Sequence, residues 1–251
     1  MTFRKLFCLL VILLPACRSK NVRPVTIVNA KLPYIDSILR YDTGVDVKIE
    51  DWKKDSLEGG MFITDINKIR VAIVAFENST WYCYVKTNGA WMLSDSFKNN
   101  QYPFEFCLTD LNGDGYDDIR LSCPVMRGNN VCTVLLYQPQ YHIFRHNSYY
   151  DQMNIGYDSA THLVRASALG GLFDNRKELY KVTGDSLTFY KGIEMIINTS
   201  GSVGELIYYE GKAGNKTEVK TIKERGNKTT GDFNKECWDD DLNYFSNGRC
   251  L

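Results

Sequence analysis

The sequence predicts an all-β protein built from antiparallel sheets, arranged as a sandwich or in a propeller-like way. The chain is rich in aromatic residues, with 16 Tyr, 12 Phe and 4 Trp, and aromatic side chains favour strands. Strand-like segments recur about every 8–12 residues with turn residues between them. The 251 residues are enough for one sizeable β domain or two small ones. The 30 basic and 30 acidic residues balance, so nothing suggests a nucleic-acid partner.

The N-terminus indicates export. A basic pair, Arg4-Lys5, precedes an apolar run over residues 6–14 that is too short to span a membrane. The run ends in the sequence L-P-A-C, which resembles a bacterial lipobox and would make Cys17 the lipidated first residue of the mature protein. An ordinary signal peptide is the alternative. Either reading implies that the mature chain is exported, and a lipid would anchor it in the bacterial cell envelope, facing the periplasm or the cell surface.

Strand patterns then follow in order along the chain. We expect a short helix within residues 32–41 and a break at Gly59-Gly60. Asn88-Gly89 between two strand patterns is a strong hairpin signal. The domain organisation that we expect is a signal peptide over 1–16, a tether over 17–31 and a single β domain over 32–251. The expected strands lie at 45–49, 61–66, 69–76, 81–86, 90–94, 131–137, 141–146, 163–168, 179–182, 186–190, 195–198, 206–210 and 217–222, with two more around residues 104–123.

The central motif is D-L-N-G-D-G-Y-D-D over residues 110–118. Oxygen-bearing side chains occur at alternate positions and glycine at position 6, as in a calcium-binding loop. Gly115 allows the sharp turn that such a loop needs. Calcium prefers six to eight oxygen ligands at roughly 2.3–2.6 Å. The expected Ca²⁺ ligands are the side chains of Asp110, Asn112, Asp114 and Asp118 and the backbone carbonyl of Tyr116.

The motif differs from an EF-hand in two respects. Position 12, which is a glutamate in the EF-hand, is Leu121, and both flanks alternate like strands. The sequence therefore predicts a strand–loop–strand unit in which Asp118 supplies the last carboxylate. The alternative is an Asp-, Asn- and Gly-rich hairpin turn that holds no metal.

The cysteines fit an exported protein. Apart from Cys8 and Cys17 there are six, and an even number in an oxidising compartment implies disulfides. We expect Cys237 and Cys250 to form a bridge near the C-terminus. The pairing of the other four, Cys83, Cys107, Cys123 and Cys132, stays open.

The loop and the strand order carry a resemblance to known proteins. D-x-N-x-D-G-x-x-D between two strands resembles the calcium loop of FG-GAP and integrin-propeller repeats. Residues 61–195 are similar to a family of exported calcium-binding proteins with a β-propeller-like fold. That family includes an immunity protein against a peptidoglycan-cleaving type IV secretion effector, and it is related in fold to inhibitors of I-type lysozyme. Those inhibitors use a Ser-Gly-x-x-Tyr loop, and the nearest match here, Ser200-Gly201-Ser202-Val203-Gly204, lacks the tyrosine.

Three functions follow from these observations. Because no nucleophile-elbow, zinc-protease or phosphate-loop motif occurs, we expect a non-enzymatic protein-binding module. The resemblance implies an inhibitor or immunity protein whose partner is a secreted or periplasmic cell-wall hydrolase. A glycan-binding module that uses Trp81, Trp91 and Trp238 is the first alternative, and a polysaccharide hydrolase with two carboxylates in a cleft is the second. The lysine-rich residues 211–229 are either a solvated surface or a docking surface for an acidic partner.

Overall fold

The computed structural model describes residues 38, 40–54, 57–76, 79–99, 105–125, 129–170, 174–197, 203–212, 215–223 and 249–250. These residues belong to one unit, Leu32–Leu251. The expected signal peptide, Cys17 and the tether lie outside the described residues, so the expected domain organisation stays a prediction. Within the described part of the chain, no helix is long and apolar enough to cross a membrane.

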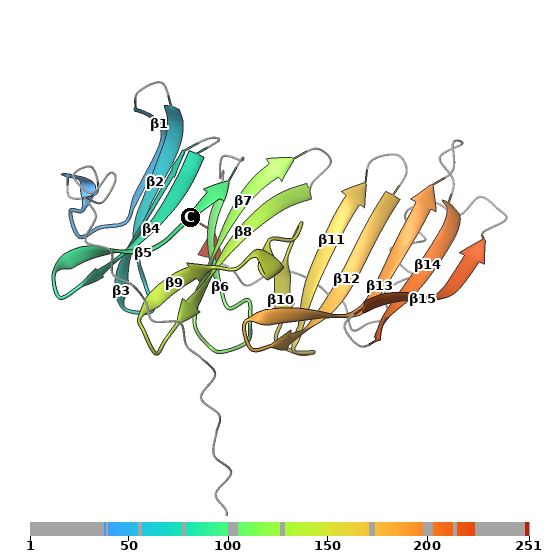
Figure 1. Ribbon diagram of the computed structural model, residues 1–251. Helices are drawn as coiled ribbons and strands as arrows, with labels where there is room; N and C mark the ends of the chain where they lie inside the picture. Colours follow the sequence, from blue (N-terminus) through green and yellow to red (C-terminus); the bar gives the residue numbers. More distant parts are fainter. Residues whose placement is uncertain are drawn as a thin grey trace, which may run out of the picture. The chain divides into compact units, whose positions relative to one another are not determined.

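The described chain forms three antiparallel sheets (Figure 1), which confirms the predicted all-β class. Sheet A contains, in spatial order, β1 (Val47–Lys54), β2 (Leu57–Ile66), β3 (Ile69–Phe76), β4 (Ser79–Thr87) and β5 (Ala90–Asn99). Sheet B has the order β16 (Arg249–Cys250), β6 (Glu105–Thr109), β7 (Asp118–Val125), β8 (Asn129–Gln138) and β9 (Ile143–His146). Sheet C contains, in order, β10 (Gly156–Asp158), β11 (Leu163–Gly170), β12 (Asp174–Thr183), β13 (Ser186–Ile197), β14 (Val203–Lys212) and β15 (Asn215–Lys223). A short 3₁₀ helix, η2 (Ser148–Tyr150), lies between sheets B and C in the sequence.

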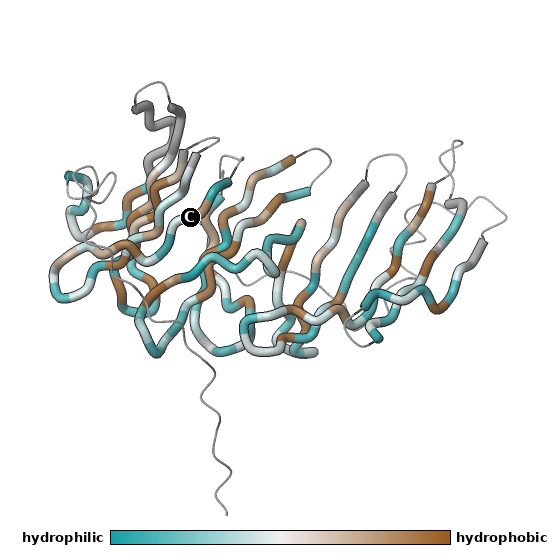
Figure 2. Tube along the Cα trace, viewed as in Figure 1, coloured by the Kyte–Doolittle hydropathy of each residue, from teal (hydrophilic) through white to brown (hydrophobic). Residues whose placement is uncertain are grey.

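Two hydrophobic cores lie on opposite faces of sheet B. One core joins side chains of β2–β4 to side chains of β6–β9, so sheets A and B pack face to face as in a sandwich. The other joins β8 and η2 to β11 and its neighbours in sheet C. Alternate residues of β8 serve the two cores: Leu135 and Tyr137 face sheet A, whereas Val134 and Leu136 belong to the second core. This explains why β8 is almost continuously apolar. Figure 2 shows hydrophobic stretches along the strands of sheets A and B.

Most expected strands are confirmed, but the expected break at Gly59-Gly60 is wrong. Gly59 and Gly60 do not break the chain but lie inside β2, opposite Phe76 and Ala75 of β3. The expected strands at 186–190 and 195–198 form one strand, because β13 continues through Gly192, which pairs with Glu178 on one side and Tyr209 on the other. In both places the ladders to neighbouring strands satisfy the glycine backbone, and this outweighs the low strand propensity of glycine.

The Asn88-Gly89 hairpin is confirmed. β4 and β5 pair on either side of it, with Thr87 opposite Ala90. Asn88 has a φ of 52° and Gly89 a φ of 81°, as a tight two-residue hairpin turn requires.

The described cysteines are in two states. Cys83, Cys123 and Cys132 are free thiols, whereas Cys107 is disulfide-bonded. Cys250 lies directly opposite Cys107 in the pairing of β16 with β6. Cys237 lies outside the described residues, so the Cys237–Cys250 bridge stays a prediction, and Cys250 has a second candidate partner in Cys107.

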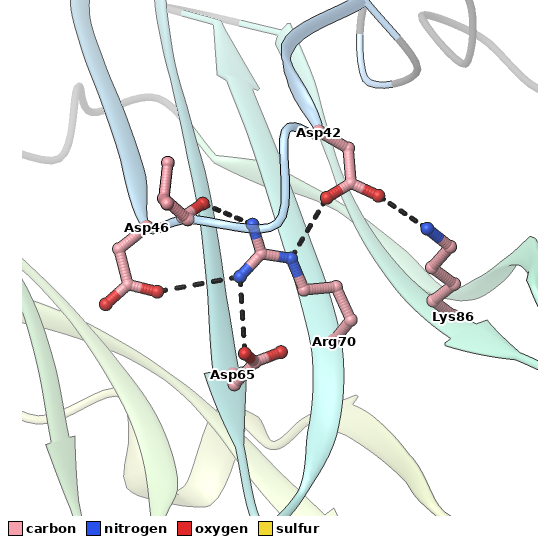
Figure 3. A network of polar contacts seen from close by, with 6 residues as sticks. Asp42, Asp46, Asp65, Arg70 and Lys86 are labelled. Carbon is pink, nitrogen blue, oxygen red and sulfur yellow. Dashed lines mark hydrogen bonds and ion pairs between the residues drawn. The ribbon is translucent and has the colours of Figure 1, made fainter.

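A cluster of charges fixes the chain before β1 to sheet A (Figure 3). Arg70 of β3 contacts Asp42 (Nε to Oδ1, 3.1 Å), Asp46 (3.6 Å) and Asp65 (3.5 Å). Lys86 of β4 lies 2.7 Å from the other oxygen of Asp42, and Arg70 also donates to the carbonyl of Val45. Burial alone would raise the pKa of Asp42, but hydrogen bonds and charges from Lys86 and Arg70 outweigh it and lower that pKa.

This lowered pKa predicts an acid-dependent contribution to stability. The carboxylate of Asp42 stabilises the fold fully above the ordinary aspartate pKa of about 4, and this stabilisation is lost as the pH falls through the lower value in the folded state. We expect Asp42→Asn to reduce the free energy of unfolding by about 1–3 kcal/mol at pH 7. The difference from wild type should shrink below pH of about 4.

Urea denaturation between pH 2 and pH 7 measures this difference. Asp46→Asn is the matched control, because the Asp46 side chain is 60% exposed and its exposed ion pair should contribute little. A difference for Asp42→Asn that stays constant or grows on acidification would contradict the assignment.

Candidate calcium-binding loop

The candidate metal loop connects β6 to β7 in sheet B. The two strands pair from Glu105 opposite Ser122 to Thr109 opposite Asp118, so the loop is closed at its base by the sheet. This confirms the predicted strand–loop–strand arrangement. Gly113 and Gly115 have φ angles of 77° and 87°, which side chains with a β-carbon rarely adopt. The glycines therefore let the loop turn twice within three residues.

The first three candidate ligands fold back over the loop backbone. Asp110 accepts hydrogen bonds from the N–H groups of Gly113 (2.6 Å) and Gly115 (2.9 Å). Asn112 accepts from the N–H of Asp114 (3.0 Å), and Asp114 accepts from that of Tyr116 (3.0 Å). Such side chain-to-backbone turns are the reason that Asp and Asn are favoured in tight loops. They hold three oxygen-bearing side chains on one short stretch of chain.

Asp118, the fourth candidate side chain, is completely buried. Its carboxylate accepts one hydrogen bond from the N–H of Leu111 in the loop (2.9 Å) and one from the N–H of Tyr137 in β8 (2.8 Å). Burial, with a smaller contribution from Asp114 and Asp110, raises the pKa of Asp118 to about 8, although the two backbone hydrogen bonds act to lower it. Asp118 thus ties the loop to the interior of sheet B.

The chemistry of the donors fits a hard cation such as calcium. All five candidate groups are oxygens, and each carboxylate oxygen retains a lone pair beyond the hydrogen bonds described. The Tyr150 hydroxyl is buried and makes no hydrogen bond to any described group. Burial raises the pKa of Tyr150, and the nearby Asp118, Asp185, Asp114 and Asp110 raise it further. This region therefore holds a surplus of negative charge that a cation would offset.

The side chains of the candidate ligands do not converge on one point. Among the described residues, no three His, Cys, Asp or Glu side chains are grouped so that they could hold a metal ion together. Asp110, Asp114 and Asp118 would have to come closer together to hold a cation jointly. Calcium binding at this loop therefore stays a prediction.

Two groups from other sheets hold the loop. Asn67, in the turn between β2 and β3, makes two hydrogen bonds to the backbone of Asp117. Tyr157 of β10 packs against Gly113 so closely that a β-carbon at Gly113 would lie 2.2 Å from the Tyr157 hydroxyl. The Tyr157 hydroxyl also lies 2.9 Å from Nδ1 of His162. Neither contact could be predicted from the sequence, because both groups are distant from the loop in the chain and belong to no local motif.

The other residues with an expected role lie elsewhere. Trp81 and Trp91 are 1% and 7% exposed, so they pack in the cores of sheet A and are not available as sugar platforms. Trp238, Cys17 and Cys237 lie outside the described residues. The expected basic surface on residues 211–229 is described only as far as Lys223.

Sheet C carries a second feature, which we name the lysine–tyrosine face. Lys181 and Lys191 lie over the ring of Tyr190, with Nζ 4.2 and 5.2 Å from its centroid, and Lys220 lies 5.5 Å from the ring centroid of Tyr208. The strand register places these side chains on one face of β12–β15. On the described part of that face, five lysines accompany one glutamate: Lys177, Lys181, Lys191, Lys212 and Lys220 against Glu210.

Comparison with known proteins yields one structural likeness. No protein-family model matches the chain, and no curated protein matches it. A solved structure described as "Structure of a Xanthomonas Type IV Secretion System related protein" is similar with a TM-score of 0.46 and 15% sequence identity, over 69% of this chain and 98% of that one.

If the loop binds calcium, the metal should stabilise the fold. We expect chelation to lower the melting temperature of the wild-type chain by several degrees, because a ligand at a hundredfold excess over Kd stabilises by about 2.7 kcal/mol. Asp114→Ala and Asp118→Ala should lower stability and abolish the calcium dependence. Differential scanning calorimetry with calcium and with chelator measures both effects.

Asp117→Ala is the matched control for this experiment. Asp117 lies in the same loop but contributes backbone atoms, not its side chain, to the contacts with Asn67. This variant should keep the calcium dependence. Identical wild-type melting curves with and without chelator would refute calcium binding.

The contact between Gly113 and Tyr157 gives a prediction that does not involve metal. Gly113→Ala should reduce the free energy of unfolding by about 2–4 kcal/mol, since it combines a left-handed backbone with a steric clash. Gly115→Ala meets no atom within 4 Å and should cost only the backbone strain of about 1–2 kcal/mol. Urea denaturation in chelator compares the two, and equal losses would show that the Tyr157 contact contributes nothing.

Proposed function

We propose that this chain is an exported calcium-binding lipoprotein that acts as a non-enzymatic protein-binding module. The lysine–tyrosine face of sheet C is the observation that carries this proposal. The partner that it fits is a protein with an acidic surface. Calcium would have a structural role, because the candidate loop belongs to sheet B while the proposed binding face belongs to sheet C.

Charge favours an acidic partner. The chain as a whole carries equal numbers of basic and acidic residues, so five lysines against one glutamate on the described part of a single sheet face are a local excess of positive charge. Lys181, Lys191 and Lys220 are exposed. Such a patch speeds association with a partner of opposite charge and disfavours association with basic partners.

Aromatic rings add contact area to the same face. Tyr190 lies beneath two lysines and Tyr208 beneath one, so each ring limits the freedom of the ammonium group above it. A partner that pairs with these lysines therefore meets side chains that are already ordered in part, and it loses less conformational entropy on binding. Tyrosine is enriched in protein–protein interfaces, which distinguishes this face from a surface of freely solvated lysines.

The more specific role that we propose is inhibition of a peptidoglycan hydrolase. It rests on the resemblance of the calcium loop and strand order to immunity proteins and lysozyme inhibitors. The Ser-Gly-x-x-Tyr loop of those inhibitors has no counterpart with a tyrosine here. We therefore assign the binding to the lysine–tyrosine face and do not transfer it from that loop.

The function is tested with the mature chain carrying Cys17→Ser, immobilised in calcium or in chelator. It is challenged with a panel of purified lysozyme-like hydrolases that span acidic and basic surfaces, and with peptidoglycan and capsule polysaccharide. Saturable binding of an acidic hydrolase together with loss of its activity supports an inhibitor. Retention of polysaccharide without protein would favour the glycan-binding alternative, and turnover of polysaccharide would favour the hydrolase alternative.

The lysine–tyrosine face gives a prediction for any partner captured in this way. Replacing Lys181, Lys191 and Lys220 by Gln should weaken binding at least tenfold at low salt, with less effect at high salt, since the attraction is screened. The matched control replaces three exposed lysines outside sheet C, which are Lys48 of β1, Lys68 of the β2–β3 turn and Lys98 of β5, and it changes the net charge equally. Equal weakening by both triple variants in surface plasmon resonance would show that net charge, not this face, drives binding.

A further inference from the structure

Asn67 connects sheet A to the candidate calcium loop by two hydrogen bonds across 50 residues of sequence. Its side-chain N–H donates to the carbonyl of Asp117 (2.8 Å), and its side-chain oxygen accepts from the N–H of Asp117 (3.1 Å). A carboxamide is a side chain that offers a donor and an acceptor side by side. Asn67 therefore pairs with Asp117 much as a neighbouring strand would.

These two bonds fix two successive peptide groups of the loop. The N–H of Asp117 belongs to the same planar peptide group as the carbonyl of Tyr116, the expected ligand at position 7. Because a trans peptide points its N–H and its C=O in opposite directions, the bond to Asn67 on one side directs the Tyr116 carbonyl to the other. The carbonyl of Asp117 belongs to the peptide group that leads into Asp118. Asn67 thus constrains the backbone on both sides of Asp117, between the last two expected ligands.

The turn itself does not account for this contact. Asn67 has a φ of 50° in the two-residue turn between β2 and β3, and asparagine is favoured at such a position for its backbone alone. Asn88 has almost the same φ, 52°, in the equivalent turn between β4 and β5. The backbone of the turn explains why asparagine is favoured at both positions. It does not explain the two hydrogen bonds that the Asn67 side chain makes to Asp117.

We propose that Asn67 is a positioning residue for calcium: it orients the Tyr116 carbonyl and the start of β7 so that the loop can close around the ion. This rests on the proposed calcium site. Residues that orient metal ligands through hydrogen bonds typically change metal affinity about 10- to 100-fold when they are lost. Through Asn67, calcium binding would also stabilise the contact between the β2–β3 turn and sheet B.

The test is isothermal titration of calcium into the purified chain and four variants. Asn67→Ala and Asn67→Gly both remove the carboxamide, and the glycine variant does so without backbone strain at positive φ. Asn88→Ala and Asn88→Gly make the same changes in the matched turn. We expect both Asn67 variants to raise the calcium Kd about tenfold or more, and both Asn88 variants to leave it within twofold. Melting temperatures in chelator are recorded for all five proteins.

The outcomes separate this inference from the function on which it rests. If the wild type binds no calcium, the proposed calcium site is refuted and this role of Asn67 falls with it. If the wild type binds calcium and Asn67→Gly binds with the same Kd, the site stands and the role of Asn67 is refuted. If Asn67→Gly and Asn88→Gly weaken binding equally, the effect arises from turn stability and the role is again refuted. Weaker binding for the Asn67 variants alone supports it, whatever the melting temperatures in chelator.

Discussion

The buried carboxylate of Asp118 is the constraint on which the candidate site depends. A carboxylate without hydrogen bonds in the interior would be strongly destabilising, and here two backbone N–H groups satisfy it, one from Leu111 and one from Tyr137. These bonds join the loop, the start of β7 and the end of β8 around one side chain. They also place Leu111, which follows the first expected ligand, in the core shared with sheet C. The loop is therefore anchored in the interior of the fold, unlike a hairpin turn that contacts only its own two strands.

Sheet B determines how the other two sheets meet the loop. Both of its faces are covered, one by sheet A and the other by residues of η2 and sheet C. The loop emerges from this central sheet, and each neighbouring sheet contributes one contact to it: Asn67 from sheet A and Tyr157 from sheet C. A cation that ordered the loop would act on contacts to all three sheets. The effect on contacts to all three sheets is a physical reason to assign calcium a structural role.

The polar clusters of the molecule serve different purposes. Around Arg70, basic and acidic groups pair with one another, and the two most buried of them, Arg70 and Asp42, form an ion pair within the fold. On the described part of the lysine–tyrosine face, lysines outnumber acidic residues, and Lys181, Lys191 and Lys220 are exposed. A local surplus of one sign on exposed side chains attracts a partner of the opposite sign. The loop has the opposite sign, with acidic groups around Asp118 and Tyr150, and it suits a cation rather than a protein.

Local patterns in the sequence determined much of this structure. Alternation and apolar runs located most strands, Asn88-Gly89 located a hairpin, and the spacing of Asp110, Asn112 and Asp114 located the loop, because each of these signals depends on neighbours in the chain. The extents of β2 and β13 could not be read in this way. Glycine has a low strand propensity in isolation, and pairing with residues of other strands decided the conformation of Gly60, opposite Ala75, and of Gly192, between Glu178 and Tyr209.

The surroundings of the loop were decided by tertiary structure alone. Nothing local to Asn67 or Tyr157 indicates that they meet the loop, since those contacts arise only when three sheets pack together. The burial of Asp118 likewise follows from β8, which lies beside β7 in sheet B. The lysine–tyrosine face depends on the register of four strands, which brings lysines from β12, β13 and β15 beside tyrosines from β13 and β14. Sequence by itself located the candidate cation ligands and the lysine-rich residues 211–229, because both are local patterns. Strand register and sheet packing decided which distant residues lie beside them.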